Sequence, residues 1–298
     1  MNSKDNHRRC GLVALVGRPN VGKSTLLNRL IDTKISITSS KAQTTRQRVR
    51  GMLTEGDDQF IFVDTPGFQT RYRSALNAQM NQIVRNALDE VDVVVAVFDA
   101  KPLNDADEQI VHLLPRSKNV IAAVNKIDMM QDKSRLLLLL NQLAKRFSFS
   151  ALVPLSATKG WQVEALKREI AARLPENAWL YDENEITDKD ERFLAAELIR
   201  EKIFRLLGDE IPYSTHVIVE RFTEEKKVRN IDARVFVERS SQRAILLGHR
   251  GQTIKRVASE ARQDMERLFG GKVFLTVRVQ VKSGWMNDAR LLRQLDIQ

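Results

Sequence analysis

The chain has 298 residues, of which 43% are hydrophobic and 29% charged, and its formal net charge is +10. This length predicts two domains of ordinary size, and the longest apolar run, the leucines at 136–140, is far too short to cross a membrane. The first nine residues are polar and there is one cysteine, so we expect no signal peptide, no internal disulfide and a cytoplasmic location.

The first functional pattern is Gly-Arg-Pro-Asn-Val-Gly-Lys-Ser at 17–24, which has the spacing of a phosphate-binding loop. An apolar run at 12–16 precedes it as a predicted buried strand, and apolar residues at helical spacing follow at 25–31. In this setting backbone N–H groups would bind phosphates, Lys23 would bridge the outer phosphates, and Ser24 would bind magnesium. The residues predicted to contact the nucleotide here are Gly17, Asn20, Val21, Gly22, Lys23, Ser24 and Thr25.

A polar loop is predicted for 34–45, followed by a hairpin of two strands at 47–54 and 59–63. The second strand ends in Asp64-Thr-Pro-Gly67. An aspartate that leaves a buried strand beside a phosphate loop can hold magnesium through a water molecule, and Gly67 leaves its N–H open to the terminal phosphate.

A predicted helix and two buried strands come next, at 77–88, 91–98 and 119–124. The last strand runs into Asn125-Lys-Ile-Asp128, a motif specific for guanine. The Asp128 carboxylate can accept hydrogen bonds from the ring N–H and the 2-amino group, which adenine does not offer. We expect Asn125 to reach the Hoogsteen edge and tie the two loops together, and the Lys126 stem to lie against the base.

The remaining elements of this half are a helix at 133–147, whose five leucines we expect in the core, a strand at 151–155 and a helix at 161–173. The strand ends in Ser156-Ala-Thr-Lys159, and the backbone N–H groups of Ser156, Ala157 and Thr158 are placed to meet guanine O6. Strands that alternate with helices predict an α/β fold with a doubly wound, mostly parallel sheet. All these motifs follow strands, where such sheets bind ligands.

An acidic, aperiodic linker at 177–190 leads to a second half with a different pattern. We expect a helix at 191–207, strands at 214–222 and 231–237 joined by the charged run 224–230, helices at 242–247 and 252–269, and a strand at 272–281. Residues 239–282 contain ten basic and three acidic residues, so this block carries +7. A concentrated basic block predicts a polyanion partner, nucleic acid first and an anionic membrane surface second.

A Gly-His-Arg-Gly loop at 248–251 joins the two helices of this half. Glycines without side chains let the backbone approach phosphates, and about four nucleotides of single-stranded RNA fit such a groove. The residues predicted to bind RNA are Gly248, His249, Arg250, Gly251, Lys255 and Arg256. Charge from the basic members should make binding sensitive to salt.

The phosphate loop together with Gln43-Thr-Thr-Arg46 resembles the Era subgroup of the translation-factor-related small GTPases, and the element order around 248–251 resembles an α+β type II KH domain. The resemblance implies a GTPase domain at 1–176, a linker at 177–190 and an RNA-binding domain with a C-terminal tail at 191–298. It also implies GTP and GDP as ligands and magnesium held by Ser24, Asp64 and a switch threonine, either Thr45, our choice, or Thr44.

Catalytic roles implied by the resemblance fall on Lys23, Thr45 and Gly67. Phe68 stands where signalling GTPases have a water-positioning glutamine, so a slow intrinsic rate is implied. Some relatives use potassium held partly by an asparagine at the position of Asn20, which we carry over as a hypothesis. The chain departs from many Era sequences at three positions: Ala42, His249 and Ala258.

The implied target is the 3′ end of the small-subunit (16S) ribosomal RNA, the implied process is assembly of the 30S subunit, and a monomer with peripheral association with the inner membrane fits the resemblance. Two alternatives stay open at this point. One is an RNA chaperone in which the nucleotide is structural, and the other is a membrane-directed regulatory GTPase whose basic block faces lipid.

Overall fold

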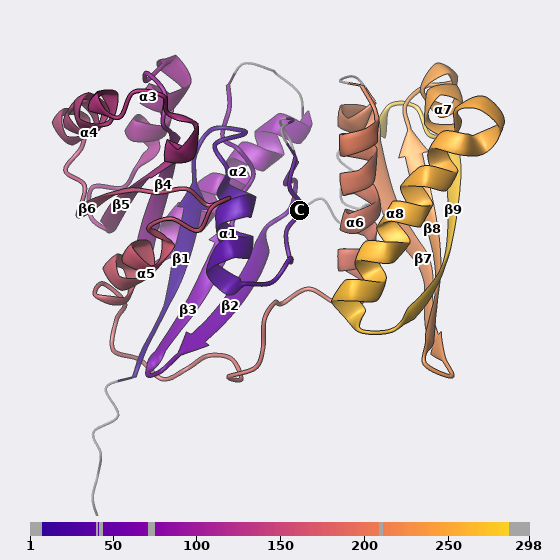
Figure 1. Cartoon of the computed structure of the whole chain (residues 1–298), viewed down its shortest axis with the longest axis horizontal. Coiled ribbons are helices and arrows are strands. Elements are labelled where there is room, and N and C mark those ends of the chain that lie inside the picture. Colours follow the sequence, from indigo (N-terminus) through magenta and orange to yellow (C-terminus); the bar gives the residue numbers. More distant parts are fainter. Residues whose placement is uncertain (1–7, 40, 42–43, 71–74, 209–210, 286–298) are drawn as a thin grey trace, which may run out of the picture. The chain divides into compact units, whose positions relative to one another are not determined.

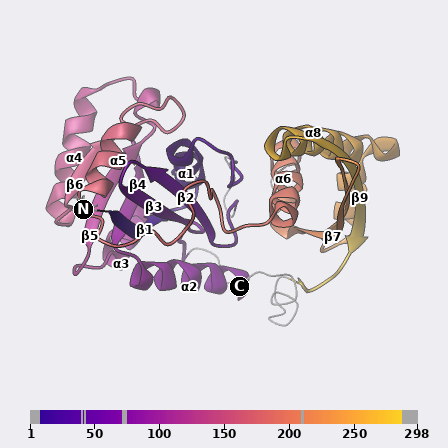
Figure 2. The ribbon, with the colours of Figure 1, turned by 90° about the horizontal axis from the view of Figure 1, so that it is seen from below.

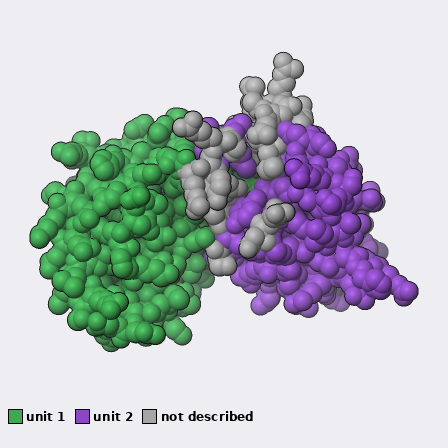
Figure 3. All heavy atoms as spheres, turned by 90° about the horizontal axis from the view of Figure 1, so that it is seen from above, with its two compact units in different colours: residues 1–36, 45–72, 79–188 green, residues 37–44, 73–78, 189–298 purple. Residues whose placement is uncertain are grey.

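The computed structural model describes residues 8–39, 41, 44–70, 75–208 and 211–285. The chain divides into two compact units, coloured separately in Figure 3. Unit 1 comprises residues 1–36, 45–72 and 79–188, and unit 2 comprises residues 37–44, 73–78 and 189–298. No helix among the described residues is both long and apolar enough to cross a membrane.

Unit 1 is built on a six-stranded sheet in the order β2-β3-β1-β4-β5-β6, in which only the β2–β3 pair is antiparallel. The sheet is therefore mostly parallel, as the sequence predicts. Its strands are β1 (Arg9–Val16), β2 (Val49–Glu55), β3 (Asp58–Asp64), β4 (Val93–Asp99), β5 (Asn119–Asn125) and β6 (Ala151–Pro154). Its helices are α1 (Lys23–Ile31), α2 (Ala75–Glu90), α3 (Asp105–Leu113), α4 (Ser134–Arg146) and α5 (Val163–Ala171).

Helices cover both faces of this sheet (Figures 1 and 2). Apolar residues of α2, α3 and α4 share one core cluster with β4 and β5, whereas α1 and α5 contact each other and the strands at the other face. Every residue of β4 is buried, which explains its continuous run of apolar side chains. The central strands are therefore packed between two layers of helices, and this packing fixes the positions of the residues at the strand ends.

Two sequence expectations about the helices of unit 1 need correction. The leucines at 136–140 are not all core residues, because Leu137 is 68% exposed and Leu138 is 63% exposed. Of the five leucines, Leu139 is buried in the core, and so is Leu143 one turn later. The reason is that a single face of a helix meets the sheet. Helix α3 was not predicted, although Asn104 caps it by accepting from the N–H groups of Ala106 (3.0 Å) and Asp107 (3.3 Å).

Unit 2 contains a three-stranded sheet in the order β7-β8-β9, antiparallel between β7 and β8 and parallel between β8 and β9. Helices α6, α7 and α8 pack on one face of it (Figure 1). The elements in chain order are α6 (Glu191–Leu206), β7 (Thr215–Glu225), β8 (Val228–Val237), α7 (Ser240–Leu247), α8 (Gln252–Phe269) and β9 (Lys272–Val281). This is the helix–strand–strand–helix–helix–strand order predicted from the sequence.

The charged run 224–230 is not the connection we expected between the first two strands of unit 2. Both strands extend into it, and only Lys226 and Lys227 form the turn, each with a positive φ. The acidic segment at 177–190 is aperiodic, and it lies along the hairpin of unit 1. Gln59 Nε2 donates to the Tyr181 carbonyl (2.8 Å), and the Met52 N–H donates to the Ile186 carbonyl (2.8 Å).

Candidate GTPase and RNA-binding sites

The phosphate loop lies between β1 and α1, and the helix begins at Lys23 itself. The Lys23 ammonium is buried and donates to the carbonyls of Gly17 (3.0 Å) and Arg18 (3.1 Å). Burial lowers the pKa of Lys23 to about 8, although the nearby carboxylate of Asp64 acts in the opposite direction. Gly17 cannot be replaced without a shift, because a Cβ there would lie 2.4 Å from the Val97 carbonyl oxygen.

The three predicted magnesium ligands converge at one buried carboxylate. Asp64 Oδ2 accepts from Ser24 Oγ (2.7 Å) and from Thr45 Oγ1 (3.3 Å), and the two hydroxyl oxygens lie 2.8 Å apart. A fourth group that the sequence did not single out, the Ser36 hydroxyl, donates to the same oxygen at 2.8 Å. Burial raises the pKa of Asp64, with Lys23 and the hydroxyl donors opposing the shift.

The other oxygen of this carboxylate, Asp64 Oδ1, is buried and accepts no hydrogen bond from the described residues. An orphaned, buried carboxylate oxygen is unusual in a protein interior. Hard oxygen ligands of this kind, one carboxylate and two hydroxyls, suit magnesium. The residues present therefore fit a magnesium site.

The two switch threonines are placed differently. The Thr45 hydroxyl donates to the Asp64 carboxylate, as described above, whereas Thr44 Oγ1 donates to the Lys41 carbonyl (2.7 Å). The Thr44 carbonyl accepts a hydrogen bond from Arg200 of α6 within unit 2. Thr38, in the same segment, donates through its N–H to Glu201 Oε1 (3.1 Å). The predicted position Ala42 lies outside the described residues.

The segment after Asp64 runs directly beneath the phosphate loop. The Phe68 N–H donates to the Gly17 carbonyl (3.2 Å), and a Cβ on Gly67 would lie 2.7 Å from the Pro19 backbone. The Phe68 ring is buried in the core cluster with β4 and α2. Its ring has no hydrogen-bonding atom, so it cannot orient a water molecule.

Asn125 ties the guanine motif to two other loops. Its Nδ2 donates to the Val21 carbonyl (2.8 Å), and its Oδ1 accepts from the N–H of Ala157 (3.0 Å). A Cβ on Gly22 would lie 2.4 Å from Asn125 Nδ2, so this glycine, with a φ of 100°, is required by the close approach. The structure thus brings the phosphate loop, the Asn125 motif and the Ser156 loop together.

The residues predicted to recognise the base lie around this junction. Asp128 is half-buried on the short 3-10 helix Ile127–Met129, Ser156 and Ala157 are buried, and Thr158 is exposed. Lys126 has a left-handed backbone (φ 69°), and its ammonium donates to the Asn20 carbonyl (2.6 Å). Asn20 also has a positive φ of 66°.

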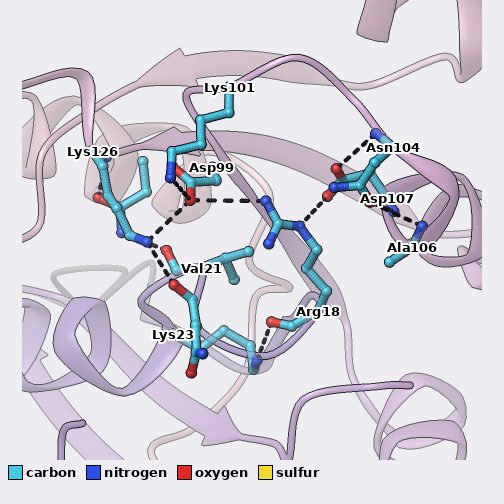
Figure 4. Close-up of polar contacts among 11 residues, drawn as sticks. Arg18, Val21, Lys23, Asp99, Lys101, Asn104, Ala106, Asp107 and Lys126 are labelled. Atoms are coloured by element: carbon cyan, nitrogen blue, oxygen red, sulfur yellow. Dashed lines mark hydrogen bonds and ion pairs between the residues drawn. The ribbon is translucent and has the colours of Figure 1, made fainter. Parts of the chain in front are cut away.

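A network of charged residues from inside and outside the motifs lies beside this junction, as Figure 4 shows. Arg18 Nε donates to Asp107 Oδ1 (2.8 Å), and Lys126 Nζ donates to Asp99 Oδ2 (3.1 Å). The residues predicted for the site did not include Arg18, Asp99, Asp107 and Ser36. The Asn-x-x-Asp pattern at 104–107 was a readable signal for the start of α3, but nothing in the sequence pairs Asp107 with the phosphate loop.

In unit 2, the Gly-His-Arg-Gly loop joins α7 to α8. Gly248 has a φ of 71°, and a Cβ there would lie 2.1 Å from Thr253 Oγ1. Gly251 has a φ of 78°, and open space surrounds the position of its missing Cβ. His249 and Arg250 are exposed at the tip, and Lys255 and Arg256 are exposed on the first turns of α8. The six residues predicted to bind RNA thus form one loop and the helix start that follows it.

Comparison with known proteins supports both units separately. Residues 12–126 match the family model of the 50S ribosome-binding GTPases, and residues 210–286 match that of the KH domain. The GTPase Era of Nitrosomonas eutropha is 51% identical over 96% of this chain and 97% of its own length. That of Neisseria meningitidis serogroup A is 52% identical over 97% of this chain and 95% of its own. The chain belongs to the Era family of GTPases.

Two solved Era structures agree with the fold over nearly the full length. A point variant of Aquifex aeolicus Era bound to GDP·AlF4⁻ is 36% identical, with a TM-score of 0.93 over 97% of this chain and 99% of its own. Era in complex with MgGDPNP and nucleotides 1506–1542 of 16S ribosomal RNA is also 36% identical, with a TM-score of 0.94 over 98% and 99%. The Era family assignment therefore confirms a GTPase domain followed by a KH domain.

Proposed function

We propose that this Era-family chain binds and slowly hydrolyses GTP with magnesium, grips the single-stranded 3′ end of 16S ribosomal RNA with its KH domain, and assists assembly of the 30S subunit. The observation that carries the proposal is the convergence of Ser24, Thr45 and Asp64 in the same chain as a Gly-x-x-Gly loop at 248–251 whose tip is exposed. The Era complex that holds both MgGDPNP and the RNA fragment supports joining the two activities.

The nucleotide-binding roles follow from the chemistry of each group. Lys23 would neutralise the outer phosphates, backbone N–H groups of the phosphate loop would cradle them, and Asp128 would select guanine. The full set proposed for nucleotide binding is Gly17, Asn20, Val21, Gly22, Lys23, Ser24, Thr25, Asp64, Gly67, Asn125, Lys126, Asp128, Ser156, Ala157 and Thr158.

Magnesium would be held by Ser24 and Thr45 directly and by Asp64 through water. When bound, it supplies positive charge that neutralises the phosphate oxygens. Lys23 and the Gly67 N–H would stabilise charge that develops on the transferred group. Since the buried Phe68 cannot orient the attacking water, we expect the intrinsic rate to be low. Asn20 is the proposed position for a potassium ligand, and equal turnover in sodium and potassium buffers would remove that role.

Control of the RNA domain by the nucleotide would pass through the switch segment. Thr45 donates a hydrogen bond to Asp64 in unit 1. The carbonyl of the preceding residue, Thr44, accepts a hydrogen bond from Arg200 of α6, and both of these residues belong to unit 2. Because Thr44 and Thr45 are consecutive, a ligand that changes the position of Thr45 would also displace the residue that hydrogen-bonds to the KH helix α6. Such a ligand shifts the equilibrium only as far as its affinities for the two arrangements differ.

For RNA, the proposed contacts are Gly248, His249, Arg250, Gly251, Lys255 and Arg256. We also propose domain boundaries at 1–176 and 191–298 with a linker at 177–190, a monomer, and a cytoplasmic protein that associates with the inner membrane at most peripherally. The buried Phe68 specifically favours one second candidate, an RNA chaperone whose nucleotide is structural.

The decisive experiment measures binding of a fluorescent 3′-terminal 16S RNA fragment to the purified chain in the presence of GDPNP, GDP or no nucleotide. We expect tighter binding with GDPNP than with GDP, and weak binding of a duplex DNA of equal length. Equal RNA affinity in all three states would favour the chaperone. Preference for ATP over GTP, or for the duplex DNA over the RNA, would refute the proposal, and vesicles that compete with RNA would indicate a membrane role.

A further inference from the structure

We propose that Asp99 is a positioning residue of the nucleotide site, which fixes the Lys126 side chain against the base and ties it to the phosphate loop. The inference rests on the proposed binding of guanine nucleotides and adds a residue that belongs to none of the nucleotide motifs. Asp99 is the last residue of β4, and its Cα pairs in register with Asn125 at the end of β5. Asp99 therefore lies opposite the residue that directly precedes Lys126.

Two contacts fix the end of the Lys126 side chain. Its ammonium donates to Asp99 Oδ2 at 3.1 Å (Figure 4). It also donates to the Asn20 carbonyl at 2.6 Å. The backbone end is fixed as well, because the Lys126 N–H donates to Asn125 Oδ1 at 2.8 Å. With both ends held, the aliphatic stem is restricted in orientation, which is what a stacking surface for a base requires.

The same carboxylate also faces the phosphate loop from a second direction. Arg18 approaches Asp99 Oδ2 to 3.8 Å and donates through Nε to Asp107 Oδ1 at 2.8 Å. Asp107 is itself held, because its Oδ2 accepts from the Asn104 N–H (3.2 Å) at the start of α3. The end of β4, the start of α3 and the phosphate loop are thus joined by one network.

Burial explains why Asp99 needs these partners. The side chain is 6% exposed, and three cations, Lys126, Arg18 and Lys101 (3.9 Å), lie within ion-pair distance of Oδ2. A carboxylate removed from water is costly unless such partners compensate for it. Removing the Asp99 charge would leave these cations without their shared partner, and the Asn20 carbonyl would be the one acceptor of the Lys126 ammonium left among the described residues.

Positioning and simple electrostatics predict opposite results when the Asp99 charge is removed. A negative charge near a polyphosphate site repels the ligand, so its loss alone would tighten nucleotide binding. Loss of a positioning contact would weaken binding instead. The direction of the change therefore identifies the role.

The experiment is a double-mutant cycle on the dissociation rate of a fluorescent GDP analogue, with Asp99→Asn and Lys126→Met, which keeps the stem but lacks the ammonium. We expect D99N to accelerate dissociation about 10-fold, within the range of coupling between contacting residues. In the K126M background the same change should have an effect below about 2-fold. Asp105→Asn, which removes an exposed carboxylate at the start of α3, is the matched control and should leave the rate unchanged.

Unchanged or slower dissociation from D99N would overturn the proposal, as would an equal D99N effect in both backgrounds, because Asp99 would then not act through Lys126. If the melting curve shows that D99N does not fold, Asp99→Glu displaces the carboxylate by one methylene and carries the same cycle, with the same expectation. Failure of the unaltered chain to bind GDP would refute the proposed function itself, which is a distinct result.

Discussion

The hydroxyl oxygens of Ser24 and Thr45 lie 2.8 Å apart, although 21 positions separate the two residues in the chain. Ser24 belongs to the phosphate loop and Thr45 to the switch segment, and both also contact Asp64. A cation that replaces these mutual hydrogen bonds would hold both hydroxyls at once. A cation bound to both hydroxyls would therefore couple the position of the switch segment to that of the phosphate loop.

Thr45→Ala should therefore lower magnesium-dependent GTP hydrolysis by at least about 10-fold, because even residues that only support a metal ligand contribute about 10- to 100-fold to affinity or activity. Thr44→Ala is the matched control, because the Thr44 hydroxyl contacts only the Lys41 carbonyl among the described hydrogen bonds. A magnesium titration of initial rates for both variants distinguishes them. If T44A loses more hydrolysis activity than T45A, the magnesium ligand is Thr44 and the choice of Thr45 is wrong.

Asp128→Asn should shift base preference from GTP toward XTP. The amide can no longer accept from both guanine N–H groups, and hydrogen bonds to a charged group are worth enough for a change of about 100-fold in selectivity. Competition of GTP and XTP against a fluorescent GDP analogue measures it. Asp132→Asn is the control, because that carboxylate is engaged by Ser134 (2.9 Å from its N–H) and Arg135 (3.4 Å). Selectivity that is unchanged in D128N would contradict the guanine role.

The lowered pKa of Lys23 predicts that nucleotide binding takes up a proton in alkaline solution. Burial lowers the pKa to about 8 without ligand, and phosphates favour the ammonium form, so affinity should fall by up to about tenfold per pH unit above this value. Without nucleotide, the unfolded chain binds more protons than the folded one between about 8 and 10.5, so the destabilising effect of burying the Lys23 ammonium declines as pH rises through that window.

Calorimetric titration with GDP at pH 8.5, in two buffers of different ionisation enthalpy, measures that proton uptake. Guanosine, which has no phosphate, is the control ligand and should bind without it. No difference between the buffers would show that Lys23 is already charged in the free protein, and proton release would also contradict the predicted uptake.

The motifs were predictable because each packs its chemistry into a few consecutive residues with fixed spacing. Lys23 and Ser24 follow the glycines of one loop, and Asn125 ends one strand. The network around Asp99 was not predictable, because Arg18 and Asp107 are 89 positions apart and meet only when the sheet is complete. Their pairing depends on strand order, which no local pattern specifies.

The leucine run was misjudged for a related reason. Consecutive leucines on a helix point in all directions, so the run contains no periodicity to show which side meets the sheet. Leu139→Ala should lower the free energy of unfolding by about 2–5 kcal/mol, because it opens a cavity in the core. Leu138→Ala, the matched control next to it, should change it by no more than about 0.5 kcal/mol. Urea unfolding of both variants tests this, and equal losses would show that Leu138 is covered in solution.

The two glycines at either end of α8 allow a sharp test of RNA binding. Gly251 and Gly270 both have a left-handed backbone, with φ of 78° and 68°, and both have open space where a Cβ would lie. Gly251→Asp and Gly270→Asp therefore impose similar backbone strain and the same change in charge. Only Gly251 lies in the Gly-x-x-Gly loop that we propose contacts RNA phosphates, so only G251D places a carboxylate against the RNA backbone.

We expect G251D to weaken binding of the 3′-terminal 16S RNA fragment by at least about 10-fold and to reduce the salt dependence of the remaining binding, because a phosphate contact is lost. G270D should bind as the unaltered chain does and melt at the same temperature as G251D. Fluorescence titrations at two salt concentrations measure both effects. Equal loss in the two variants would mean that charge or strain, rather than the loop, controls binding, and the RNA groove would have to be sought elsewhere on the KH domain.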